Sequence, residues 1–76
     1  MVHAFILVKT AAGKSETLLA SVRELAIATE AHIIAGDYDL IVEVDAEVVY
    51  DILQAASTTI QEMEGVLETK TYISMQ

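Results

Sequence analysis

The segment Gly36-Asp37-Tyr38-Asp39 has the side chains best suited to binding a small ligand. It combines two carboxylates and a phenol in a turn, where backbone amides are exposed. Such a loop can hold an ammonium group against a carboxylate, and a carboxylate group against N–H donors. These are the two ends of a free amino acid. The alternative is a plain hairpin turn, in which Gly36 supplies a positive φ and aspartate hydrogen-bonds the backbone.

Three hydroxyl-bearing residues near the end of the chain are further candidates for the same ligand. Thr69, Thr71 and Tyr72 lie in a stretch rich in β-forming residues, which we expect to be the last strand. Their hydroxyl groups could add contacts to a ligand held by the loop. Strand propensity alone also explains why these residue types occur there.

Other kinds of chemistry have little support in the sequence. Gly13-Lys14-Ser15 is similar to the end of a phosphate-binding loop, but Val8 stands where that motif needs another glycine. The two histidines, His3 and His32, have no third ligand at a metal-binding spacing. Cysteine is absent, which excludes disulfides, thiolate metal sites and thiol nucleophiles. We therefore expect no catalytic residues, no metal and no cofactor.

The charge balance argues against nucleic acid and anionic membranes as direct partners. The chain has 12 acidic and 4 basic side chains in 76 residues, a net charge of −8. Neutralising phosphates needs clustered lysine and arginine, and the four basic residues are scattered. No signal peptide and no apolar run of membrane-spanning length is visible. We expect a cytoplasmic protein.

The hydrophobic pattern predicts a single domain of six elements. They are a strand over 3–9, a helix over 15–28 capped by Ser15, a strand over 31–35, a strand over 40–44, a helix capped by Asp45 that ends at Glu64-Gly65, and a strand over 66–75. This βαββαβ order predicts an α+β, ferredoxin-like fold. Two helices cover one face of a four-stranded antiparallel sheet whose first and third strands are central. The expected inward residues are apolar: Leu18, Val22, Leu40, Val42, Val44, Ile52 and Leu53.

The face of the sheet without helices needs a partner. Residues 4–8 are apolar on both faces, and alternation adds Ile34 and Ile41 to the uncovered side. The sequence is 54% hydrophobic, which is more than a domain of this size easily hides. We expect two copies to pack sheet against sheet as a homodimer. A monomer that tolerates an exposed apolar face is the alternative.

The chain resembles the ligand-binding domain of the Lrp/AsnC transcription regulators, also called the regulation-of-amino-acid-metabolism (RAM) domain. The matching segments are Ala4-Phe5-Ile6-Leu7-Val8-Lys9, Ala35 through Val44, Glu64-Gly65-Val66, and Thr69-Lys70-Thr71-Tyr72-Ile73. The resemblance implies dimers that often assemble into rings, commonly octamers, with amino-acid effectors bound in these domains. It implies that Asp39 takes part in the effector response, that Gly36, Asp37 and Tyr38 line the same turn, and that Tyr72 and Ile73 contribute from the last strand.

Full regulators of this family carry an N-terminal helix-turn-helix, whereas this sequence starts at the first strand. We therefore expect residues 1–76 to be one stand-alone effector-binding domain that does not contact DNA directly. Its acidic, lysine-poor composition resembles that of haloarchaeal members.

Three functions remain open from the sequence. The first is a non-enzymatic amino-acid sensor and oligomerisation module, an accessory to transcriptional or metabolic regulation that joins mixed rings with full-length regulators. The second is a purely structural oligomerisation partner that has lost effector binding. The third is an enzyme of the dimeric α+β barrel type, which the apolar inward residues disfavour because they leave no polar substrate cavity.

Overall fold

The computed structural model describes residues 1–75 and has the predicted order of strands and helices. The strands are β1 (Val2–Thr10), β2 (Ala28–Ile33), β3 (Leu40–Ala46) and β4 (Val66–Ile73). The helices are α1 (Ser15–Arg23), α2 (Val49–Gln54) and η1 (Ala55–Ile60), a π-helical segment that continues α2.

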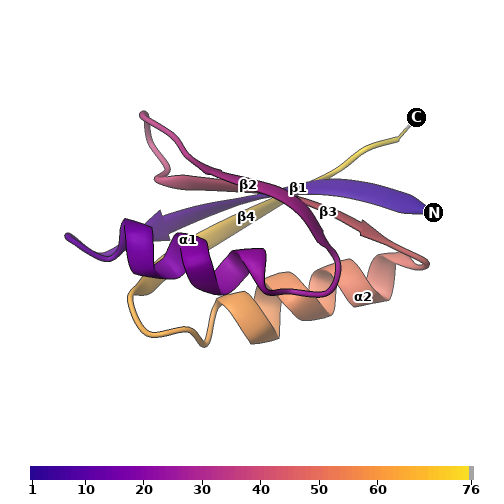
Figure 1. Cartoon of the computed structure of the whole chain (residues 1–76). Coiled ribbons are helices and arrows are strands. Elements are labelled where there is room, and N and C mark those ends of the chain that lie inside the picture. The colour runs from indigo at the N-terminus through magenta and orange to yellow at the C-terminus, as the bar shows by residue number, and fades with distance from the viewer. Residues whose placement is uncertain (76) are drawn as a thin grey trace.

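The four strands form one antiparallel sheet in the order β2-β3-β1-β4. Both helical segments lie on the same side of this sheet, and the other side is uncovered (Figure 1). The predicted ferredoxin-like fold, with the first and third strands at the centre, is confirmed. We call the uncovered side the open face.

Strict alternation along β1 divides its side chains between the two faces of the sheet. Ala4, Ile6 and Val8 are fully buried under the helices, whereas Phe5 and Leu7 are half-buried on the open face. Six of the seven predicted inward residues lie in the core, and the prediction for Leu53 is wrong because its side chain is 47% exposed. In α2 and η1 the core positions belong to Ile52, Ala56 and Ile60. Leu53 follows Ile52 by about 100° around the helix and therefore turns toward solvent.

The first helix is shorter, and the second strand starts earlier, than the sequence predicted. α1 ends at Arg23 instead of residue 28, and β2 covers 28–33 instead of 31–35. Pairing with β3 explains the change, because the N–H of Asp45 donates to the carbonyl of Ile27 at 2.9 Å. Residues 24–27, which the periodicity assigned to the helix, form turns instead, and Ala28 begins the strand. Ile34 lies in the loop directly after β2 and not within the strand.

Both predicted helix caps are wrong. Ser15 is the first helical residue, and its hydroxyl pairs with the Thr10 hydroxyl at 2.8 Å. Asp45 stays in β3, where its carboxylate bonds to the His3 ring, and α2 begins at Val49 without a side-chain cap.

The end of the second helix and the end of the last strand also differ from the prediction. The helical residues stop at Ile60, followed by turns that lead to Gly65 at φ +99°, and β4 stops at Ile73 instead of residue 75.

Candidate functional site

The predicted ligand loop joins β2 to β3 at one end of the sheet (Figure 1). The N–H of Ile34 donates to the carbonyl of Asp39 at 2.8 Å, which closes the loop at its base. The N–H of Asp39 donates to the carbonyl of Val8 at 2.9 Å, so the loop is also fixed to β1. Gly36 has φ +145°, a conformation that favours glycine. The hairpin geometry and a ligand-binding role are compatible in this arrangement.

Consecutive backbone donors are available at the tip of the loop. None of the hydrogen bonds among residues 1–75 uses the N–H of Gly36, Asp37 or Tyr38. The Asp37 side chain is exposed beside them. A run of backbone N–H groups in a turn can bind a carboxylate, and an adjacent aspartate can pair with an ammonium group.

Asp39 has a structural partner that sequence reasoning missed. Its Oδ2 accepts a hydrogen bond from the N–H of Thr10 at 2.8 Å and a longer one from the Thr10 hydroxyl at 3.3 Å. Thr10 is only 8% exposed, so these groups are removed from water. The carboxylate therefore ties the loop to the end of β1 just before α1. Nothing in the local sequence signals this contact, because the two residues are 29 positions apart.

Tyr38 lies close to two lysines from different strands. The ammonium groups of Lys9 and Lys70 are each 6.0 Å from the centre of its ring. Its hydroxyl donates to Glu68 Oε2 at 2.7 Å, and this hydrogen bond raises the pKa of Tyr38 to about 12. The basic residues look scattered in the sequence, but the fold brings Lys9 and Lys70 together here. Strand alternation places Lys9 on the open face, but only the register with β4 adds Lys70.

The predicted residues of the last strand divide between the two faces of the sheet. Tyr72 pairs with Phe5 and lies on the open face, as Tyr38 does through its contacts with Lys9 and Glu68. Thr69, Thr71 and Ile73 are partly buried on the helix face, where the Thr69 hydroxyl donates to Gln61 Oε1 at 3.2 Å. Within one chain the structure does not bring these three residues together with Tyr72.

A second polar group lies at the other end of the open face. The His3 ring bonds to Asp45 through Nδ1 at 2.5 Å and to Glu43 through Nε2 at 3.1 Å. The hydrogen bond that the Asp45 carboxylate accepts from the ring is the largest cause of the raised pKa of His3. The ring of Phe5 meets the imidazole edge-on at 5.0 Å. Both ring nitrogens are thus engaged by carboxylates, and residues 1–75 include no cluster arranged to hold a metal ion.

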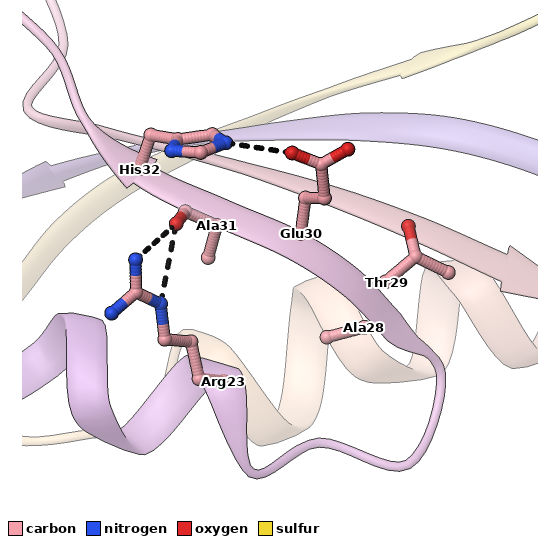
Figure 2. Close-up of a pocket in the computed structure, with 6 residues that line it drawn as sticks. All are labelled: Arg23, Ala28, Thr29, Glu30, Ala31 and His32. Carbon is pink, nitrogen blue, oxygen red and sulfur yellow. Dashed lines mark hydrogen bonds and ion pairs between the residues drawn. The ribbon is translucent and has the colours of Figure 1, made fainter.

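A shallow cavity of about 230 Å³ lies along the outer edge of β2. Figure 2 shows Arg23 on one side of the strand and the bonded pair Glu30–His32 on the other. The guanidinium donates to the carbonyl of Ala31 through Nη2 at 2.8 Å and Nε at 3.3 Å. An edge carbonyl blocked in this way resists strand addition by another chain. No predicted site residue lines this cavity.

In the part of the chain that the structure describes, no helix is long and apolar enough to cross a membrane.

The chain is similar to several solved structures. A hypothetical protein, PHS023 from Pyrococcus horikoshii, is 36% identical with a TM-score of 0.90, and the match covers 100% of this chain and 92% of that one. AsnC of Escherichia coli is 25% identical with a TM-score of 0.89, covering 99% of this chain but only 51% of AsnC. The transcriptional regulator NMB0573 of Neisseria meningitidis, solved as a complex with L-Met, is 17% identical with a TM-score of 0.85, covering 99% and 50%.

The family comparison covers almost the whole sequence. A search of curated proteins found no match. Residues 3–76 match the family model described as the Lrp/AsnC ligand binding domain. This is a regulatory ligand-binding family, in agreement with the resemblance seen in the sequence. The chain therefore belongs to the Lrp/AsnC ligand-binding domain family.

Proposed function

We propose that this chain is a non-enzymatic module that binds a free amino acid or a related small metabolite and self-assembles. It would act in the cytoplasm as an accessory to transcriptional or metabolic regulation, without contacting DNA itself. The observation that carries this proposal is the loop tip, where three successive N–H groups lack acceptors among residues 1–75, beside the exposed Asp37. Family membership supports the same conclusion.

The ligand's two charged ends fit the loop. Its α-carboxylate accepts from the N–H groups of Gly36, Asp37 and Tyr38, and its α-ammonium pairs with the Asp37 carboxylate. Asp39 positions the loop through Thr10. The L-Met bound to the regulator NMB0573, which has the same fold, supports an amino acid as the ligand class.

The last strand contributes to the site in two ways in this proposal. Tyr72 lies on the face that Tyr38 shares and is available to the same ligand. Thr69, Thr71 and Ile73 contact the ligand only from a neighbouring copy, because they are on the helix face of their own chain. A ligand held between dimers would then stabilise a ring, since it binds only the assembled state.

The dimer in this proposal forms through the open face. Phe5, Leu7 and Ile41 are half-buried there and Tyr72 is 49% exposed, in the middle of a sheet that has no cover on this side (Figure 1). A second copy packed sheet against sheet removes this apolar surface from water, which stabilises the pair. Larger rings, including mixed rings with full-length regulators, would be built from such dimers.

The test is a thermal-shift and calorimetric titration with each of the twenty amino acids, with light-scattering mass recorded in parallel. We expect one amino acid, or a chemically related few, to raise the melting temperature or change the mass. Asp37→Ala should abolish that response, whereas Glu47→Ala should retain it, since Glu47 is an equally exposed acid beyond the far end of β3.

The outcomes separate the proposal from its alternative. A stable assembly that responds to none of the twenty amino acids would favour a purely structural oligomerisation module. A response retained in full by Asp37→Ala would overturn the role given to this loop.

A further inference from the structure

The open face has opposite charges at its two ends. At the end near the loop, the ammonium groups of Lys9 and Lys70 each lie 6.0 Å from the centre of the Tyr38 ring, and we call these two lysines the basic cluster. Glu68, which pairs with Lys9 and accepts a hydrogen bond from the Tyr38 hydroxyl, is at the same end, so two ammonium groups and one carboxylate lie there. At the other end and toward β2, Glu30, Glu43 and Asp45 form what we call the acidic cluster. Strand pairing places all five residues on the open face. Asp45 pairs with His3, Glu43 pairs with both Phe5 and Glu30, and Lys70 pairs with Leu7. Lys9 is on the same face because it alternates with Leu7 along β1.

Apolar side chains lie between the two clusters. Leu7 pairs with Ile41 on one side, and Phe5 pairs with Tyr72 on the other, so the four occupy the centre of the face. Apolar contact alone does not fix how two such faces are rotated against each other. Charged groups placed at opposite ends of the patch can fix that rotation.

Resting on the sheet-to-sheet dimer of the proposed function, we propose that charge sets its register. The basic cluster of each copy lies on the acidic cluster of its partner. This arrangement has a two-fold axis that lies between the two sheets and is perpendicular to the line joining the clusters. Because each copy presents the same surface, the axis brings both basic clusters onto the partner's acidic clusters.

The alternative registers are electrostatically unfavourable. A two-fold axis along the line that joins the clusters would place the three carboxylates of the acidic cluster against the same three of the partner. It would also place the two lysines against the partner's two lysines, with Glu68 beside them. Like charges that face each other at an interface cost free energy and reject that arrangement. The proposed register instead gives each lysine a carboxylate partner.

The acidic cluster retains acceptor atoms for a partner's lysines. His3 uses only one oxygen of each neighbouring carboxylate, Asp45 Oδ1 and Glu43 Oε1. Among residues 1–75, no hydrogen bond uses Asp45 Oδ2 or Glu43 Oε2. On the basic side, neither lysine has an ion pair within 4.0 Å in the described part of its own chain. Both sides are therefore available for pairing across the interface.

A charge-exchange experiment tests this register. One variant carries Lys9→Glu and Lys70→Glu, and the other carries Glu43→Lys and Asp45→Lys. We expect each variant alone to dimerise at least about tenfold more weakly than the natural chain, because most of the charge contacts between the two clusters become repulsive. Mixed in equal amounts, the two should form a heterodimer close to the natural affinity, measured by native mass spectrometry and sedimentation.

Matched controls carry the same changes in charge away from the open face. Lys14→Glu with Thr17→Glu and Gln54→Glu, and Glu47→Lys with Glu62→Lys, alter exposed residues on the helix side or in loops. These two control variants should keep their dimer affinity within about threefold and should show no preference for each other when mixed.

A cross-linking measurement on the natural chain keeps the proposal falsifiable if a variant fails to fold. A zero-length carbodiimide reagent applied to mixed light and heavy isotope-labelled chains should join Lys9 or Lys70 of one copy to the partner's Glu43 or Asp45. A natural chain that stays monomeric overturns the sheet dimer itself. A dimer without these cross-links, or variants that show no preference for each other, overturns the register alone.

Discussion

Replacing Asp39 with alanine should destabilise the fold even if no ligand is present. The change removes the acceptor of the Thr10 N–H, which is bonded at 2.8 Å. Thr10 is 8% exposed, so water cannot replace the lost partner, while its hydroxyl still has Ser15. A buried donor left without an acceptor costs about 1–3 kcal/mol. We therefore expect Asp39→Ala to lower the free energy of unfolding by about 2 kcal/mol, a large fraction of the stability of a small domain.

Urea unfolding followed by circular dichroism measures this loss. With a denaturant slope of about 1 kcal/mol per molar urea, expected for a small domain, the midpoint should fall by about 2 M. Protein concentration must be held constant, because self-association contributes to the measured stability. Asp39→Asn, which keeps an acceptor oxygen, should cost less than about 1 kcal/mol. Asp37→Ala should stay within about 0.5 kcal/mol of the natural chain.

A loss below about 0.5 kcal/mol for Asp39→Ala would refute the anchoring role of this carboxylate. The expected result also affects how effector experiments are interpreted. If Asp39→Ala abolishes a ligand response, that loss reports displacement of the loop as well as any missing contact. Asp37, which is exposed and lies outside these bonds, is the better probe of ligand contact.

Three further predictions concern the turns and the titrating groups. Gly65→Ala should destabilise the chain by more than about 1 kcal/mol in urea unfolding, because φ is +99° and a Cβ would lie 3.0 Å from Lys14 Cγ. Gly13→Ala should cost less, because a Cβ at Gly13 would meet open space. The raised pKa of His3 means that its contribution to stability is present below pH 6.5 and is lost as pH rises through the folded value; His3→Gln should remove this slope from stability measured against pH. Absorbance at 295 nm should show one of the three tyrosines ionising at a pKa of about 12, and Glu68→Gln should lower that pKa toward 10 if Tyr38 is the residue concerned.

The strands and their order could be predicted from the sequence because alternation is a local signal. The run from Ala4 to Val8 is apolar at every position, which is typical of a central strand with apolar side chains on both faces of the sheet. The boundary at Arg23 could not be predicted in the same way. Helical periodicity continues beyond it, but residues 24–27 form turns that lead into β2, where β3 offers hydrogen-bond partners such as the N–H of Asp45. A non-local pairing overrides local propensity here.

The candidate site shows the same division between local and non-local signals. The Gly36–Asp39 loop could be found because glycine and aspartate favour turns. Asp45 has the side chain of a helix cap, and sequence reasoning assigned it to one, but its partner is His3, 42 positions away. Thr10 is a comparable case, since its partner Asp39 is on another strand's loop. Contacts of this kind depend on which residues pair across neighbouring strands, and no single segment of the sequence specifies that pairing.

Register also links the core of this protein to its proposed assembly. The pairing of Ile6 with Val42 builds the apolar layer under the helices, and the same pairing places Phe5 beside Glu43 on the other face. A shift of the strand register by one residue would turn the core side chains toward the open face. It would also move the charged side chains of that strand to the helix face. The charge-exchange variants therefore test more than a dimer contact. A heterodimer that forms only from the complementary pair requires every strand to keep its position, so recovery of affinity on mixing would report an intact sheet and a correct register at once.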